Sequence, residues 1–158
     1  MNFDIPVELS SYLSELDIFI VEKIKPLEEK DDNVRFFDHR REYSRTDWER
    51  GGRPSKEWEE LLAKTRKIAD EAGHYRYAFP REHGGRDGTN LGMAIIREHL
   101  ASKGLGLHCD LQNEHSIVAN NIALLLMLNY GSEEQKATWA EKLAAGDVMF
   151  AFGITEPK

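Results

Sequence analysis

The 158-residue sequence predicts an all-α fold, an up-down bundle of about five helices followed by one terminal β-strand. Three observations predict this fold class. Apolar residues recur at helical spacing in several segments, breaks rich in glycine, proline or aspartate separate these segments, and a β-type apolar run ends the chain. Helices that come first and a strand that comes last indicate a helical domain at residues 1–146, with the first strand of a truncated β-domain at residues 147–158.

The first predicted helix covers residues 7–27. Its apolar positions recur at helical spacing, and they are Leu9, Leu13, Leu16, Ile20 and Ile24. The Asp31-Asp32-Asn33 run ends this helix. Residues 34–54 are predicted to be irregular, because aromatic and charged residues alternate there without a helical period before Gly51-Gly52-Arg53-Pro54 breaks the chain.

The segment from Val34 to Lys56 is locally basic, with seven lysines and arginines against four acidic residues. Two interpretations stay open. The segment is either a binding patch for a phosphate-bearing ligand or a surface loop whose charges pair with one another. Mixed charge is the ordinary state of an exposed surface, so we favour the second interpretation.

The second predicted helix begins after Ser55, which is expected to act as its N-cap, and it ends at Gly73. Residues 74–89 are predicted to form a loop because they contain Pro80 and three glycines. The third helix covers residues 90–103, and Gly104 ends it.

The fourth predicted helix spans residues 111–129. Its second half, I-A-L-L-L-M-L, is apolar all round, so we expect this helix to be buried on every side and central. Ser132, with Gln135 three residues later, predicts a capping box for a fifth helix that ends at Gly146. Its inner face should carry Trp139, Ala140, Leu143 and Ala144. An apolar strand, residues 148–154, follows.

Composition limits the classes of function. The net charge of -7 argues against a protein whose whole surface binds nucleic acid, which usually needs a basic face. The single cysteine, Cys109, rules out an intrachain disulfide and fits a cytoplasmic protein. The longest apolar stretch in the helical part is far shorter than the roughly 20 residues that span a bilayer, so no membrane span is expected.

A run of metal-capable side chains includes His108, Cys109, Asp110, Glu114 and His115. Zinc sites prefer tight Cys/His pairs and usually four ligands, a pattern that this run lacks. We therefore predict no metal site, and we expect the polar run to cap the fourth helix. A Cys–His nucleophile pair is also disfavoured, because no positioned base or oxyanion site lies nearby in the sequence.

The C-terminal part of the sequence resembles a known enzyme family. From residue 115 to residue 157 the sequence reads "HSIVANNIALLLMLNYGSEEQKATWAEKLAAGDVMFAFGITEP". This order of helix, G-S-x-E-Q, helix, glycine, strand and T-E-P resembles the junction between the first helical domain and the middle β-domain of FAD-dependent acyl-CoA dehydrogenases. The loop "YAFPREHGGRDG" is similar to the family's P-x-x-x-G-G-x-G stretch.

The resemblance implies a reaction and site residues. In the family a glutamate removes the α-proton of an acyl-CoA thioester and a hydride passes to FAD. By position, Phe152 and Ile154 would line the flavin ring and Thr155 would donate hydrogen bonds to it; ordinary β-core packing is the alternative for the two apolar residues. His115 and Val118 would face the acyl-chain tunnel. The alternative is that His115 caps a helix and Val118 belongs to the core.

The resemblance also implies what these 158 residues do not contain. The family's G-S-D stretch, which binds the FAD pyrophosphate, and its catalytic glutamate have no counterpart here, so we assign no catalytic residue and expect an N-terminal fragment that is inactive alone. The parent enzyme would use an acyl-CoA, FAD and an electron-transfer acceptor, and would form a homo-oligomer. The alternative is a non-enzymatic helical interaction module derived from the same domain.

Overall fold

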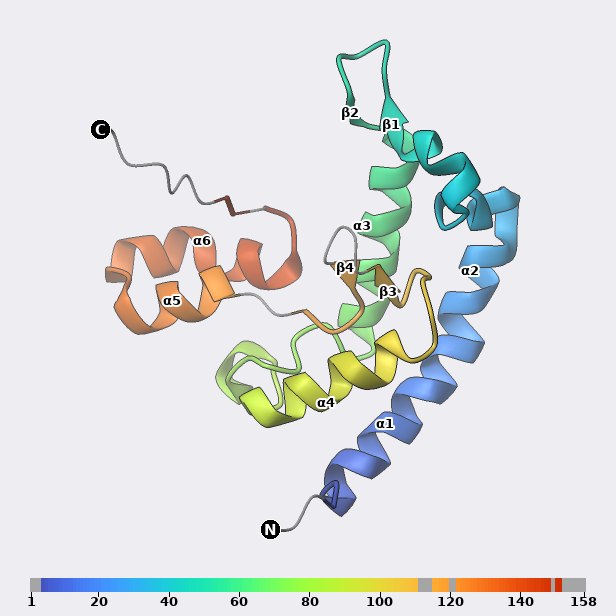
Figure 1. Cartoon of the computed structure of the whole chain (residues 1–158). Helices are drawn as coiled ribbons and strands as arrows, with labels where there is room; N and C mark the ends of the chain where they lie inside the picture. The colour runs from blue at the N-terminus through green and yellow to red at the C-terminus, as the bar shows by residue number, and fades with distance from the viewer. Residues whose placement is uncertain (1–3, 111–114, 120–121, 149, 152–158) are drawn as a thin grey trace, which may run out of the picture.

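The computed structural model describes residues 4–110, 115–119, 122–148 and 150–151 (Figure 1). The all-α class is confirmed for these residues. Helices dominate, and the sheets are two short antiparallel pairs, β1 with β2 and β3 with β4. Within the described part of the chain, no helix is long and apolar enough to cross a membrane.

The N-terminal helix is one rod, as Figure 1 shows in blue. It consists of α1 (Val7–Phe19), a π-helical turn (Ile20–Ile24) and α2 (Lys25–Glu29). All five apolar positions predicted for this helix are buried. The rod ends where Asp31 and Asp32 adopt left-handed backbone angles, with φ of 54° and 56°. Aspartate tolerates this conformation better than most residues, which explains why the predicted stop signal works.

The segment that follows is irregular, as predicted. It contains two 3₁₀-helical stretches (Lys30–Phe36 and His39–Arg45) and the hairpin of β1 (Thr46–Asp47) and β2 (Arg53–Pro54). Thr46 pairs with Pro54 and Asp47 with Arg53. The hairpin projects from one end of the molecule (Figure 1).

Two helices and a glycine-rich loop complete the main body. Helix α3 (Lys56–Glu71) and helix α4 (Asn90–Ala101) confirm the second and third predicted helices. Thr89 caps α4 by accepting a hydrogen bond from the Gly92 N–H at 3.0 Å. Ser55 stands at the N-cap position of α3, but its hydroxyl donates to the Ser44 carbonyl at 2.9 Å instead of capping the helix. This bond joins the irregular segment to α3.

The fourth predicted helix is wrong over its first half. Within the predicted range, β4 (His115–Ser116) pairs with β3 (Cys109–Asp110), and α5 (Ile122–Tyr130) covers the second half. Residues 111–114 and 120–121 of the predicted helix lie outside the described residues. The backbone groups of this stretch bond to distant residues rather than to the preceding helical turn. The Ile117 N–H donates to the His108 carbonyl at 3.2 Å, and the Ala119 N–H donates to the Tyr75 carbonyl at 3.0 Å. These long-range bonds stabilise the extended conformation.

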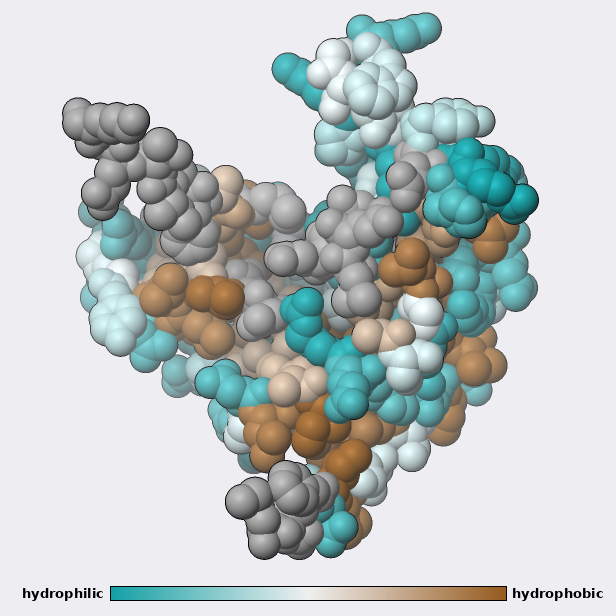
Figure 2. Space-filling view, in the orientation of Figure 1, coloured by the Kyte–Doolittle hydropathy of each residue, from teal (hydrophilic) through white to brown (hydrophobic). Residues whose placement is uncertain are grey.

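The expectation that the apolar helix is central is also wrong for the described structure. Helix α5 packs against α6 (Glu133–Ala145), and Leu124 is the one residue of α5 that is buried among those described. The opposite face stays exposed because no other described element covers it. Ile122, Leu126 and Tyr130, spaced four residues apart, are 54%, 43% and 84% exposed. Figure 2 shows apolar atoms at the surface over this helix.

Helix α6 forms as predicted. The Gln135 N–H donates to the Ser132 hydroxyl at 3.2 Å and the Ser132 N–H donates to the Gln135 side chain at 2.9 Å, which confirms the capping box. Leu143 and Ala144 are buried, as expected. Trp139 is 44% exposed and contacts the Lys142 ammonium across its ring face, so its predicted inward position is wrong.

The terminal strand lies mostly outside the described residues. Val148, Phe150 and Ala151 form no strand in the part of the chain that the structure describes. Residues 152–158, which include the three positions assigned to the flavin, lie outside it. The predicted boundary between two domains at residue 147 therefore stays a prediction.

The close backbone contact at Gly85, in the loop between α3 and α4, can be tested by substitution. A Cβ atom added at Gly85 would lie 1.9 Å from the Phe79 carbonyl oxygen, so the loop backbone would have to shift. We expect Gly85→Ala to lower the free energy of unfolding by about 3 kcal/mol in denaturant titrations.

Gly51→Ala is the matched control. Gly51 has a φ of 76° and no atom within 4 Å of an added Cβ. Its substitution should therefore cost only the backbone strain, about 1 kcal/mol. Equal losses in the two variants would contradict the steric explanation for Gly85.

Candidate functional site

The β3–β4 hairpin, taken together with residues 106–108 that lead into it, gathers most of the buried polar side chains of the described structure. Five of the seven buried polar or charged residues lie in it or contact it, and they are Glu28, Arg45, His108, Asp110 and His115. They come from the N-terminal rod, the irregular segment and the hairpin itself. Buried polar groups need partners, so their arrangement fixes how these three parts of the chain meet.

A buried ion pair attaches the irregular segment to the hairpin. Arg45 Nη1 donates to Asp110 Oδ2 at 2.6 Å, with side-chain exposures of 9% and 0%. The Arg45 guanidinium also donates to the Phe36 carbonyl and lies over the Trp58 ring at 4.8 Å. A buried charge is tolerated in the protein interior only while such partners compensate for the lost water.

A second set of contacts links α2 to the hairpin. Lys25 Nζ donates to Glu28 Oε1 at 2.7 Å, and the Leu107 N–H donates to Glu28 Oε2 at 2.9 Å. The carbonyl of the same Leu107 accepts a hydrogen bond from His115 Nε2 at 2.9 Å. His115 is 8% exposed, and burial lowers its pKa to about 4. The ring is therefore neutral at neutral pH.

His108 is the second buried histidine of this hairpin. It is fully buried, and its Nε2 donates to the Gly104 carbonyl at 3.1 Å. Its Nδ1 has no hydrogen-bond partner among the residues that the structure describes. Burial lowers the pKa of His108, and the nearby Lys25 charge lowers it further. His108 is thus also held in its neutral form.

The polar run at residues 108–110 does not cap a helix, contrary to expectation. Asp110 pairs with Arg45, and Cys109 is buried, which raises the pKa of its thiol and disfavours the reactive thiolate. Among the described residues, no three histidine, cysteine, aspartate or glutamate side chains are arranged to hold a metal. Glu114, the fifth member of the predicted metal-capable run, lies outside the described residues.

The structure brings the two predicted substrate residues into one segment. His115 lies in β4, and Val118, which is 2% exposed, packs into the main core beside Ile117. Both are on an extended segment rather than on the expected helix. Two open surface hollows, of about 490 Å³ beside the β1–β2 hairpin and about 350 Å³ between α2 and α3, include neither residue. The acyl-site assignment of His115 and Val118 stays a prediction.

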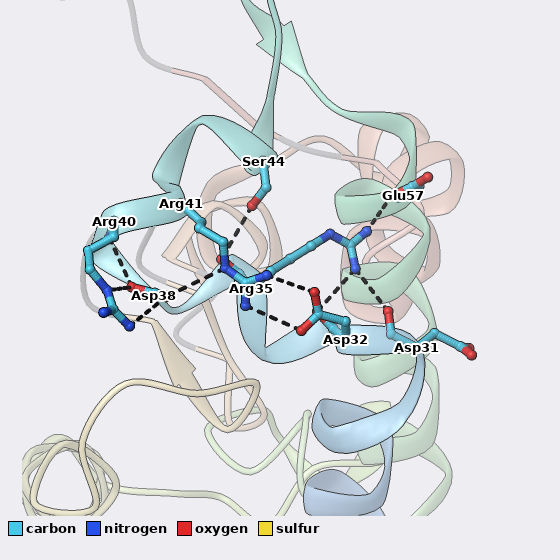
Figure 3. A network of polar contacts seen from close by, with 8 residues as sticks. All are labelled: Asp31, Asp32, Arg35, Asp38, Arg40, Arg41, Ser44 and Glu57. Carbon is cyan, nitrogen blue, oxygen red and sulfur yellow. Dashed lines mark hydrogen bonds and ion pairs between the residues drawn. The ribbon is translucent and has the colours of Figure 1, made fainter.

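The basic segment is a network of ion pairs, as Figure 3 shows. Arg41 pairs with Asp32 at 2.7 Å, Arg40 pairs with Asp38 at 3.0 Å, and Arg35 contacts Glu57. The hydrogen bonds from Arg40 lower the pKa of Asp38 to about 2. The structure therefore favours the paired surface loop over the phosphate patch.

The buried ion pair predicts a large effect of one substitution. Asp110→Ala leaves the Arg45 charge buried without its carboxylate partner, so we expect a loss of about 3–5 kcal/mol in the free energy of unfolding. Glu60→Ala is the control, because it removes an exposed pair with Lys56 on α3 and should cost less than about 1 kcal/mol. A small loss in Asp110→Ala would show that the pair does not connect the two segments.

The lowered pKa values of His108 and His115 predict that the fold loses stability in acid. Their folded-state pKa values lie below the ordinary 6.5, so the unfolded chain binds protons more readily. Stability should be fully present above about pH 6.5 and should fall towards pH 4, with about 3 kcal/mol lost through His115. Denaturant titrations at several pH values measure this slope, which His115→Gln should reduce. If stability falls as steeply with pH in His115→Gln as in the unsubstituted chain, His115 is not the source of this loss.

Comparison with known proteins gives the family. The family model for the acyl-CoA dehydrogenase N-terminal domain matches residues 30–147. The "Probable acyl-CoA dehydrogenase YngJ" of Bacillus subtilis (strain 168) is 32% identical over 98 residues, which are 62% of this chain and 24% of that protein. The glutaryl-CoA dehydrogenase of Desulfococcus multivorans is 28% identical over 159 residues, covering 99% of this chain and 34% of its own length.

The chain thus spans about a third or less of the length of these relatives. No solved structure matches the chain. The match to the family model extends over well more than half of the chain and includes α3 to α6 and the β3–β4 hairpin. The chain therefore belongs to the acyl-CoA dehydrogenase family and represents its N-terminal, mostly helical portion.

Proposed function

We propose that this chain is the N-terminal portion of an enzyme that catalyses FAD-dependent α,β-dehydrogenation of an acyl-CoA thioester. The match of residues 30–147 to the family's N-terminal domain carries the proposal. The enzyme passes its electrons to an electron-transfer acceptor, acts in the cytoplasm and is a homo-oligomer.

In this proposal the chain contributes binding surface rather than the reacting groups. His115 in β4 and Val118, just after it, would border the acyl chain, and the residues around Thr155 would contact the flavin. Because His115 is buried and its ring is uncharged at neutral pH, it would act as a hydrogen-bonding or packing group rather than as a general acid. The catalytic glutamate of the proposed enzyme would come from the part of the family's length that these 158 residues do not span.

FAD would supply the hydride acceptor of the reaction when bound. The residues assigned to it by the resemblance, Phe152, Ile154 and Thr155, lie outside the described residues. Their assignment to the flavin therefore depends on the resemblance alone. The 158 residues by themselves should neither retain FAD nor oxidise an acyl-CoA.

The first test is the protein produced from its full gene. We expect a product much heavier than 18.1 kDa that carries flavin absorbance and reduces an artificial electron acceptor in the presence of acyl-CoA thioesters. The 158-residue chain, purified in parallel, should do neither. A gene product of 18.1 kDa without flavin and without activity would contradict the proposal.

One observation favours the second candidate, a non-enzymatic interaction module. Ile122, Leu126 and Tyr130 form an exposed stripe on α5, and exposed apolar stripes of this kind often contact other proteins. Under this alternative the same chain would bind a partner without any flavin. The outcome of the mass and flavin measurement separates the two candidates.

The proposed acyl site predicts a change in selectivity. Val118→Ala enlarges the space beside the hairpin, so the ratio of kcat/KM for long over short acyl thioesters should rise about tenfold in the full enzyme. The ratio isolates selectivity, because a loss of stability lowers both rates together.

Val34→Ala is the matched control, since Val34 is 43% exposed and lies in the irregular segment. Its acyl-chain preference should equal that of the unsubstituted enzyme. If Val118→Ala also leaves the ratio unchanged, Val118 does not border the acyl chain and is a core residue alone.

A further inference from the structure

Leu107 connects a buried carboxylate to a buried imidazole. Its N–H donates to Glu28 Oε2, and its carbonyl accepts from His115 Nε2, both at 2.9 Å. Glu28 lies in α2 and is 7% exposed, so water competes little for its oxygens. Leu107 is therefore fixed by hydrogen bonds at both its N–H and its carbonyl group.

The carbonyl contact sets the tautomer of His115. A carbonyl oxygen can only accept a hydrogen bond, so Nε2 must carry the ring proton in the neutral imidazole. Nδ1 is then the unprotonated nitrogen, which accepts hydrogen bonds. The position of the Leu107 carbonyl therefore decides which nitrogen of His115 is a donor and which is an acceptor.

We propose that Glu28 is a positioning residue for His115. By holding the Leu107 N–H, it places the Leu107 carbonyl where it fixes the ring orientation and the Nε2–H tautomer of His115. Nδ1 is then presented as a hydrogen-bond acceptor for an N–H or O–H group. That this group belongs to a bound acyl-CoA rests on the proposed function; the role of Glu28 does not.

The length of the glutamate side chain is central to this role. Lys25 occupies Oε1 of Glu28, so Oε2 is the oxygen that reaches across to the hairpin. Space for this reach exists because residue 106 is glycine. A Cβ added at Gly106 would lie 2.6 Å from Glu28 Oε2 and 2.8 Å from His108 Nδ1. The carboxylate thus fits against the hairpin backbone in a gap that any larger residue would fill.

Other charged groups also act on His115. Asp110 from β3 raises the pKa of His115, whereas Arg66 from α3 and the neighbouring His108 lower it. Lys25 and Glu28 act on the adjacent His108. A test of Glu28 must therefore separate its charge from its reach, since its charge acts on His108 and His108 in turn acts on His115.

Two substitutions separate these properties. Glu28→Gln removes the charge but keeps a carbonyl oxygen at the same distance for the Leu107 N–H. Glu28→Asp keeps the charge but shortens the side chain by one methylene group, which withdraws the acceptor from Leu107. If Glu28 acts by position, Glu28→Gln should keep the His115 tautomer and the slow Leu107 amide exchange of the unsubstituted chain, and Glu28→Asp should not. The loss of charge in Glu28→Gln should lower the pKa of His108, which the Glu28 carboxylate raises.

The measurement is nitrogen-15 NMR of the histidine rings across a pH titration, together with the hydrogen exchange of the Leu107 amide. The unsubstituted chain should show the Nε2–H tautomer for His115 and a slowly exchanging Leu107 amide. In Glu28→Asp we expect a mixture of tautomers and a pKa of His115 that falls further, because the hydrogen bond to the Leu107 carbonyl raises this pKa and is weakened. The Leu107 amide should exchange at least about tenfold faster. His74, which contacts Tyr12 and Phe19 on α1, reports whether the fold is intact.

Three results would overturn the proposal: an Nδ1–H tautomer of His115 in the unsubstituted chain, wild-type behaviour in Glu28→Asp, or equal effects of both substitutions. Adding an acyl-CoA tests the ligand part separately. A changed shift at Nδ1 of His115 supports the acyl site. An unchanged shift, with the Glu28 results as expected, would contradict the assignment of His115 to the substrate but not the role of Glu28.

Discussion

The buried pair of Arg45 and Asp110 is the interaction on which the rest of the structure depends. It joins the irregular segment to the hairpin across 65 positions of sequence. Both charges have left water, so each is tolerated only while the other is present. The Trp58 ring on α3 covers the guanidinium, which brings a third part of the chain into the same contact. The position of the hairpin therefore depends on this buried ion pair.

The hairpin is held from two directions by different chemistry. Asp110 faces the irregular segment through a charge pair, whereas Leu107 faces α2 through its backbone bond to Glu28. Between these anchors the two histidines stay neutral because they are buried. The apolar side chains of this extended segment fill the core, but polar groups decide its position, since each of them has a specific partner and geometry.

Short sequence patterns predicted those parts of the fold that are stabilised by hydrogen bonds between residues close in sequence. The capping box of Ser132 and Gln135 is one such case, since it depends on residues three positions apart. The first half of the fourth helix failed because bonds to Tyr75 and Arg45, far away in sequence, stabilise an extended chain there. For the site, resemblance could name His115, but no sequence pattern points to Glu28, which meets the hairpin across 79 positions.

Gly85 belongs to the stretch that resembles the family's P-x-x-x-G-G-x-G motif, and its backbone lies very close to the Phe79 carbonyl. The glycine is required because the loop folds back onto its own Phe79 carbonyl, and that contact involves the chain's own backbone alone. In this chain the glycine is therefore explained by the shape of the loop rather than by the chemistry of a bound group. A descendant that had lost its flavin and its reaction would still keep this glycine, as long as its loop folded in the same way.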